Sequence, residues 1–144
     1  MIKLENVYSG YNRTAIIKNI DLTFEEKSIT TIIGKNGCGK TTLLRTASNL
    51  LKPFQGKVYI VDKDITDMPS KELAKKISFL PQIRSVPNIS VYNLVMHGIY
   101  PYLGFSRTPQ AEDKKIVADA IHKLNLEKLI NKNIQQLSGG QRQK

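Results

Sequence analysis

The chain has 144 residues, 40% of them hydrophobic and 24% charged, which excludes a collagen-like, low-complexity or wholly disordered protein. The chain has 22 Lys and Arg against 12 Asp and Glu, a formal net charge of +10. Its lysines are scattered along the sequence, which favours a solvated surface over a continuous basic surface that binds nucleic acid. The chain has a single cysteine, Cys38, which excludes a disulfide framework and a multi-cysteine metal site. It has no long apolar run and no signal-peptide core, which predicts a cytosolic protein.

The N-terminal part of the chain is predicted to form β-strands. Apolar and polar residues alternate over Ile2–Tyr8 and again from Lys18 to Phe24, the period of half-buried strands. Ser9–Arg13 between them is predicted to be a turn. The segment Ser28–Ile33 is β-branched almost throughout, which is typical of a strand buried on both faces.

The segment Gly34–Thr42 follows this strand directly, precedes the helical run Leu43–Ser48, and contains the P-loop pattern Gly-x-x-x-x-Gly-Lys-Thr. Its glycines let the backbone fold into a nest of N–H donors around an anion, and the helix N-terminus adds a positive dipole. We expect Lys40 to bind the β- and γ-phosphates of a nucleotide and Thr41 to ligate Mg²⁺. The residues expected to contact the nucleotide are Gly34, Asn36, Gly37, Cys38, Gly39, Lys40, Thr41 and Thr42.

Short elements follow the P-loop helix. Lys57–Val61 is predicted to be a strand and Lys71–Lys76 a short helix with Ser70 as its cap. Ile77–Leu80 is again strand-like and stops just before Gln82.

The remainder of the chain is predicted to be helical. Ser90 is a candidate N-cap for a helix over Val91–His97, with Gly98 at its end. Thr108 followed by Pro109 has the pattern of a cap and a first helical position. A helically spaced apolar stripe predicts a buried face formed by Ile116, Val117, Ala120, Ile121 and Leu124.

A second candidate anion site lies in Leu137–Gln141. Ser138 followed by Gly139 and Gly140 predicts a helix N-terminus whose N–H groups no side chain covers. Alone, this pattern favours a flexible linker, since Ser-Gly-Gly is common in linkers. In a chain that also carries a P-loop, an anion site is the better interpretation.

With both motifs in place, the chain resembles the ATP-binding-cassette (ABC) ATPases. Gly34–Thr42 is similar to their Walker A loop and Leu137–Gln141 to their signature motif, in matching order and spacing. The resemblance implies an α/β P-loop NTPase core with an antiparallel β subdomain and a helical subdomain, truncated after the signature motif. The implied division is a β subdomain plus P-loop core at about 1–82, a helical subdomain at 83–136, and the signature motif with the start of its helix at 137–144.

The same resemblance implies ATP and Mg²⁺ as cofactors and a head-to-tail homodimer. In that family each ATP lies between one P-loop and the partner's signature motif, so Ser138 and Gly140 would contact the γ-phosphate across the dimer. Gln82 resembles the Q-loop glutamine, which contacts Mg²⁺ or the attacking water. The implied catalytic residues are Gln82, Ser138 and Gly140, and the implied metal ligands are Thr41 and Gln82.

Adenine recognition is assigned by the same resemblance. Tyr11 lies where the family has an aromatic residue that stacks on adenine. Tyr8 is the competing candidate, but its place at a strand end favours a role in the core or at the sheet edge. Stacking on an aromatic face is worth about 1–3 kcal/mol and suits any base.

One subfamily resembles this chain in two further segments, Val95–Gly104 and Ala111–Asp113. These segments are similar to the corresponding ones in the ATPases of importers for iron chelates (siderophores), haem and cobalamin, although Ile99 stands where those ATPases usually have arginine. The implied function is the ATP-binding subunit of an ABC importer that couples ATP hydrolysis to uptake of an iron–siderophore or related metal chelate. Its partners would be transmembrane permease subunits, docked through Ile83–Gly104, and a second copy of the ATPase, at the cytoplasmic face of the membrane. We expect no direct contact with the transported solute and no nucleic acid.

Two other functions stay open at this point. One is a soluble ABC ATPase that acts on nucleic acid or ribosomes, and the other is a non-catalytic nucleotide-binding fragment. In the family, the Walker B strand, the catalytic glutamate and the switch histidine would follow Lys144. We therefore expect ATP hydrolysis from the full-length protein, and nucleotide binding without turnover from these 144 residues.

The family's sheet also places two strands, both beyond Lys144, between Ile29–Ile33 and Ile77–Leu80. We expect these two segments not to pair with each other. The side chains then expected to be exposed are Ile32, Ile33, Phe79 and Leu80. The pair Lys27–Ser28 stands where the family has a glycine, which predicts a different conformation for that turn.

Overall fold

The computed structural model describes residues 1–81, 86–104 and 108–142. The chain divides into two compact units, residues 1–79 and 80–144, and each unit has its own hydrophobic core. The first unit carries an antiparallel sheet and the second is helical, which agrees with the predicted α/β fold class. None of the helices within the described ranges is long and apolar enough to cross a membrane.

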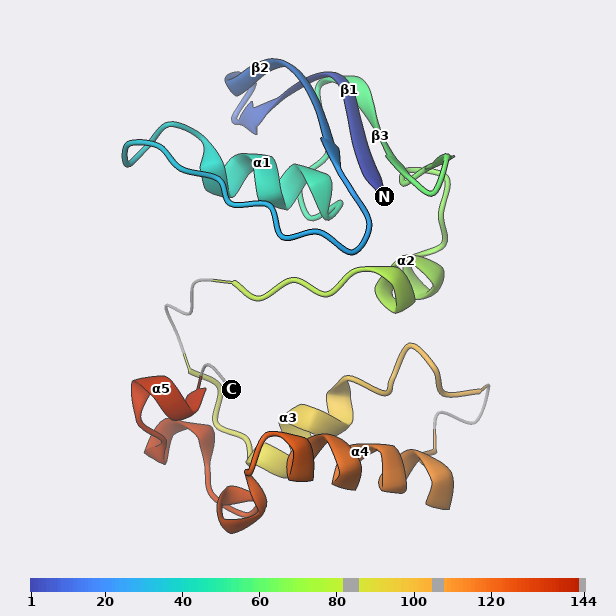
Figure 1. The fold of residues 1–144 in the computed structure, drawn as a ribbon, viewed down its shortest axis with the longest axis vertical. Helices are drawn as coiled ribbons and strands as arrows, with labels where there is room; N and C mark the ends of the chain where they lie inside the picture. The colour runs from blue at the N-terminus through green and yellow to red at the C-terminus, as the bar shows by residue number, and fades with distance from the viewer. Residues whose placement is uncertain (82–85, 105–107, 143–144) are drawn as a thin grey trace. The chain divides into compact units, whose positions relative to one another are not determined.

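The first unit contains a four-stranded antiparallel sheet in the order β2-β1-β3-β4 (Figure 1). Its strands are β1 (Ile2–Tyr11), β2 (Thr14–Phe24), β3 (Gln55–Ile60) and β4 (Lys63–Asp64). The alternating segments are thus confirmed as strands. The predicted turn is shorter than expected, because β1 pairs with β2 as far as Tyr11 and the hairpin turns at Asn12 and Arg13, both at positive φ.

One face of this sheet packs against α1 (Lys40–Ala47) (Figure 1). Burial of alternate strand residues supplies the core, because successive side chains of a strand point to opposite faces. The buried residues of this cluster are Leu4, Val7, Ile17, Ala47, Val58, Ile60, Ile65 and Met68. The short helix α2 (Ser70–Lys76) has Pro69 at its N-cap, so Ser70 is its first residue and not the predicted cap.

The second unit is built from α3 (Val91–His97), α4 (Ala111–Lys123), two 3₁₀ turns at Glu127–Leu129 and Ile134–Gln136, and α5 (Gly139–Arg142). Ser90 is confirmed as the cap of α3, since its Oγ accepts a hydrogen bond from Asn93 N at 3.3 Å. The predicted cap at Thr108 is wrong. The backbone N–H of Gln110 donates to the carboxylate of Asp113 at 2.9 Å, and this pair starts α4 at Ala111.

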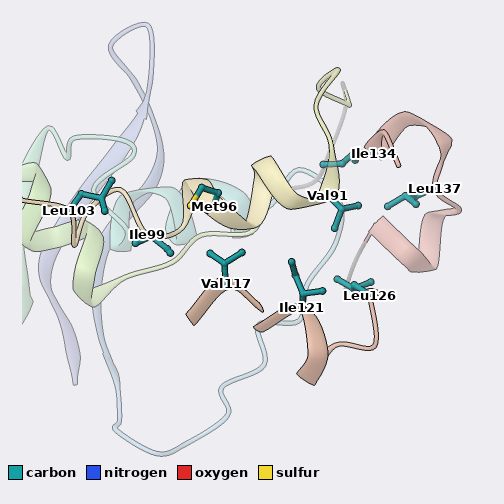
Figure 2. Close-up of a cluster of buried hydrophobic side chains, with 9 residues drawn as sticks. All are labelled: Val91, Met96, Ile99, Leu103, Val117, Ile121, Leu126, Ile134 and Leu137. Carbon is teal, nitrogen blue, oxygen red and sulfur yellow. The ribbon is translucent and has the colours of Figure 1, made fainter. Parts of the chain in front are cut away.

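The core of this unit lies between α3, α4 and the segment that leads to α5 (Figure 2). Val117 and Ile121 of the predicted stripe are fully buried, whereas Ile116 is 60% exposed, so the buried face of α4 is narrower than the sequence pattern indicated. The labelled residues of the cluster are Val91, Met96, Ile99, Leu103, Val117, Ile121, Leu126, Ile134 and Leu137.

Two predicted strands, Ser28–Ile33 and Ile77–Leu80, are not strands in the structure. Both segments lie outside the sheet without regular secondary structure, and they do not pair with each other. Ile33 and Leu80 are 89% and 74% exposed, as expected, while Ile32 and Phe79 are half-buried. A β-strand exists through its ladder hydrogen bonds, and no strand within the described ranges pairs with either of these segments.

The turn before the P-loop segment places a residue with a Cβ in the conformation that glycine favours. Lys27 has φ of +54°, in the left-handed region, and the Oγ of Ser28 donates to the carbonyl oxygen of Glu25 at 2.8 Å. A residue with a Cβ is disfavoured in this region, and glycine is not. Lys27 therefore has the backbone conformation that glycine favours, and its backbone is strained.

Lys27→Gly should raise the free energy of unfolding by about 0.5–1 kcal/mol, because it relieves this strain. Urea denaturation of the two proteins measures the difference. The matched control is Lys52→Gly, which removes a lysine from an exposed position without positive φ and should not stabilise. Equal midpoints for Lys27→Gly and wild type would show that the turn is not strained.

Candidate phosphate-binding loop

The loop between residues 34 and 39 depends on two glycines in the left-handed region. Gly37 has φ of +82° and Gly39 has φ of +99°. A Cβ on Gly37 would meet nothing within 4 Å, whereas a Cβ on Gly39 would lie 2.8 Å from Cγ2 of Ile17. Gly37 is thus required by conformation alone, and Gly39 by conformation and by its close packing against β2.

Lys40 is the first residue of α1, and its side chain folds back across the loop. Its Nζ donates to the carbonyl oxygens of Gly34 and Lys35, each at 2.7 Å. The same Nζ lies 3.7 Å from Sγ of Cys38, an exposed thiol, and a Cβ on Gly34 would lie 2.8 Å from that sulfur. The structure therefore brings Gly34, Cys38 and Lys40 together.

The electrostatics of this loop suit an anion. The first turn of α1 contains no acidic residue, so nothing there offsets the positive end of the helix dipole. Among the residues that the structure describes, the ammonium of Lys40 contacts two neutral carbonyl oxygens and the thiol of Cys38, and no carboxylate. The exposed backbone around Gly37 leaves room for phosphate oxygens to approach the N–H groups. The charge and accessibility of these residues fit the triphosphate group of a nucleotide.

The two threonines that follow Lys40 differ in accessibility. Thr42 is 4% exposed and its side chain belongs to the interior of the unit, whereas Thr41 is exposed at the start of α1. Of the two hydroxyls, Thr41 therefore offers the accessible oxygen for a metal ion. Asn36 is also exposed, in the loop itself. Gln82, the other predicted metal ligand, lies outside the described residues.

A buried pair of hydroxyls attaches α1 to the sheet. Oγ1 of Thr46 lies 2.8 Å from Oγ of Ser9 on β1 and 2.8 Å from the carbonyl oxygen of Thr42. Both Ser9 and Thr46 are completely buried, so loss of the Thr46 hydroxyl would take this hydrogen-bond partner from Ser9 where water does not replace it. Sequence reasoning missed this pair, since nothing local connects residues 37 positions apart.

Tyr11 lies at the end of β1 and is 38% exposed. Its hydroxyl accepts a hydrogen bond of 3.3 Å from Nη1 of Arg45 on α1, and Cζ of Arg45 is 5.9 Å from the centroid of the ring. The predicted adenine-binding tyrosine is therefore in contact with the helix that carries the P-loop lysine. Arg45 was not predicted, because 34 positions separate the two residues.

The second predicted anion site forms the start of α5, in the second unit. Oγ of Ser138 accepts from Gln141 N at 3.3 Å, and Oε1 of Gln141 accepts from Ser138 N at 3.0 Å, a reciprocal cap. The predicted helix N-terminus is thus present. A Cβ on Gly139 or Gly140 would meet nothing within 4 Å, so the backbone of this turn is uncovered.

The predicted site residues are divided between the two units. Tyr11 and the loop of residues 34–42 lie together in the first unit, and Ser138 and Gly140 lie in the second.

Comparison with known proteins gives one consistent family. Residues 17–144 match the family described as ABC transporter. The chain is 40% identical over 144 residues to the "Probable siderophore transport system ATP-binding protein YusV" of Bacillus subtilis, covering 99% of the chain and 52% of that protein. It is 36% identical over 141 residues to the ferric enterobactin transport ATP-binding protein FepC of Escherichia coli, covering 97% of the chain and 52% of that protein.

Solved structures agree. An ATP-binding cassette in a dimeric post-hydrolysis state, bound to ADP and phosphate, superimposes with a TM-score of 0.81 at 31% identity, covering 99% of this chain and 66% of that one. The chain thus spans about half the length of the curated relatives named above.

Gly39→Ala should distort the loop. The added methyl group would occupy the space of Ile17 Cγ2 at a φ that costs about 1–2 kcal/mol for a residue with a Cβ. We expect a lower thermal unfolding midpoint and loss of affinity for inorganic tripolyphosphate. The control is Gly104→Ala, where a Cβ meets nothing within 4 Å and φ is not positive; if both variants bind tripolyphosphate as wild type does, the packing of Gly39 is irrelevant to the loop.

Proposed function

The chain belongs to the ABC transporter family, and from this premise we propose that the protein is the ATP-binding subunit of an importer that takes up an iron–siderophore or related metal chelate. The observation that carries the nucleotide part of the proposal is the arrangement of Lys40 and the two left-handed glycines at the start of α1. The substrate class is supported by the relatives' names, which refer to siderophore and ferric enterobactin transport.

In the proposed mechanism, the loop binds the triphosphate of ATP. The Lys40 ammonium exchanges its two carbonyl partners for oxygens of the β- and γ-phosphates, and the N–H groups of the loop and the start of α1 donate to the same oxygens. Thr41 and Gln82 would hold Mg²⁺, which neutralises the charge that develops on the phosphates during transfer. Tyr11 would stack on the adenine ring.

The second motif acts on a different nucleotide in this proposal. Ser138 and Gly140 of one copy would donate hydrogen bonds to the γ-phosphate bound by a second copy, head to tail. The uncovered backbone of Gly139 and Gly140 supports this role, because a phosphate can approach N–H groups that no Cβ shields. Positioning by both copies would complete the site for ATP hydrolysis, which we propose for the full-length protein.

The same proposal gives the protein membrane partners. Permease subunits would dock on the region 83–104 at the cytoplasmic face of the membrane. The described part of this region exposes large apolar side chains at Leu94, Tyr100 and Tyr102, which are 47%, 52% and 60% accessible. Such exposed side chains are suited to burial against another protein. The ATPase itself would not contact the transported chelate.

Lys40→Ala in the full-length protein should abolish ATP binding and, in a deletion strain, fail to restore uptake of a ferric siderophore. The reason is loss of the ammonium that the loop holds over the phosphate site. Lys35→Ala is the matched control, since it removes a lysine side chain from the same loop but keeps the carbonyl that Lys40 contacts. Normal ATP turnover by Lys40→Ala would refute the nucleotide site. A deletion strain that imports ferric siderophores normally would refute the substrate class.

Ser138→Arg should disrupt the anion site at the start of α5 and leave the loop of residues 34–42 intact. A large side chain at the start of α5 would block a phosphate from a second copy, while the loop of residues 34–42 would be unaffected. We expect unchanged ATP affinity of the isolated subunit and a loss of about 10²-fold or more in hydrolysis by the assembled transporter. Asn131→Arg adds the same charge at an exposed position of the same unit and should hydrolyse ATP normally; equal rates for the two variants would contradict the role across the dimer.

A further inference from the structure

The last turn of α1 contacts the end of β1 at two neighbouring positions. Thr46 is joined to Ser9 inside the core, and Arg45 reaches Tyr11 at the surface. Ser9 and Tyr11 are two positions apart on the same strand. The buried pair therefore fixes the distance between helix and strand, and Arg45 and Tyr11 meet across that fixed distance.

Arg45 contacts Tyr11 in two ways. Its Nη1 donates to the phenolic oxygen at 3.3 Å, and its Cζ is 5.9 Å from the ring centroid. The second distance is within the range of a cation–π interaction, and the planar guanidinium is well suited to an aromatic face. Together the contacts restrict both torsions of a side chain that is 38% exposed and lies beside the hairpin turn at Asn12.

A restricted ring is a better ligand for a base than a freely rotating one. An exposed aromatic side chain loses rotational freedom when a base stacks on it, and that loss opposes binding. Contact with Arg45 imposes part of this loss before the nucleotide arrives. With Arg45 in place, 38% of the Tyr11 residue surface is still exposed, and a second flat group can stack on the part of it that belongs to the ring.

The same helix carries the phosphate-binding lysine. About 7.5 Å of helix rise separates Lys40 from Arg45, and the two lie on one short, rigid element. The distance between the phosphate site and the aromatic ring is therefore set within α1 and its attachment to β1.

We infer that Arg45 is a positioning residue for nucleotide binding: it holds the Tyr11 ring at a fixed place relative to the loop, so that adenine stacks on the ring while the loop binds the phosphates. This inference rests on the proposed function. It assigns to Arg45 no contact with the nucleotide.

The test compares two probes, Mg-ATP and inorganic tripolyphosphate, on the full-length protein. The affinity for tripolyphosphate measures phosphate binding by the loop alone. The ratio of the ATP affinity to the tripolyphosphate affinity measures the contribution of the base. Arg45→Ala should weaken ATP by about two- to fivefold, the range of an exposed cation–π contact, and leave tripolyphosphate unchanged. Tyr11→Ala should weaken ATP by about fivefold or more and also leave tripolyphosphate unchanged.

A double-mutant cycle gives the decisive readout. Arg45→Ala added to Tyr11→Ala should cause no further loss of ATP affinity, because Arg45 acts only through the ring. Arg45→Lys should recover part of the ATP affinity, since it keeps a cation near the ring but loses the planar contact. Lys52→Ala removes a positive charge just after α1 and should leave both affinities at the wild-type value.

The outcomes separate this inference from the proposed function. A wild-type protein that binds neither probe would overturn the nucleotide site and the inference with it. Weaker ATP binding for Tyr11→Ala but not for Arg45→Ala would leave the nucleotide site intact and overturn the role of Arg45. Equal losses of ATP and tripolyphosphate in Arg45→Ala would likewise overturn it, because they would show an effect of charge or folding on the loop. Thermal unfolding of each variant identifies a folding defect. If Arg45→Ala is unstable, the ATP affinity of Arg45→Lys decides, and no recovery of affinity in that variant would overturn the role of Arg45.

Discussion

The attachment of α1 to the sheet is the constraint on which the site depends. Gly39, where the loop enters the helix, packs against Ile17 with no space for a Cβ. Near the other end, Thr46 and Ser9 share a hydrogen bond in the interior. These two contacts fix both ends of a short helix that would be marginal in isolation. The candidate phosphate-binding loop is therefore held at its C-terminal end by packing of Gly39 against the sheet.

The loop is also held by its own lysine. Lys40 donates to the carbonyl oxygens of Gly34 and Lys35, so its ammonium joins the start of α1 to the beginning of the loop. In the proposed function, oxygens of a phosphate take the place of these neutral acceptors, and an anionic acceptor adds the attraction of two opposite charges to the hydrogen bonds of the ammonium. One side chain thus holds the loop together and is also the proposed ligand of the phosphates.

Much of this protein follows from local sequence patterns. The P-loop, the cap at Ser90 and the helix start at Ser138 were all predicted, since each depends on residues within one turn of the chain and on the conformational freedom of glycine. The alternating strands of the first unit were predicted for the same reason, because their period is two residues. The role of Gln82 in metal binding stays a prediction.

Only the tertiary structure decided which residues support these motifs. Ser28–Ile33 has the composition of a buried strand, yet it forms none here, because a strand needs ladder partners that composition cannot supply. The contacts of Arg45 with Tyr11 and of Thr46 with Ser9 join residues more than 30 positions apart. No local pattern encodes such a pair, since it depends on how the helix lies on the sheet. The chemistry of the candidate phosphate site is therefore encoded in a short stretch of sequence, whereas the packing of α1 on the sheet holds that chemistry in place.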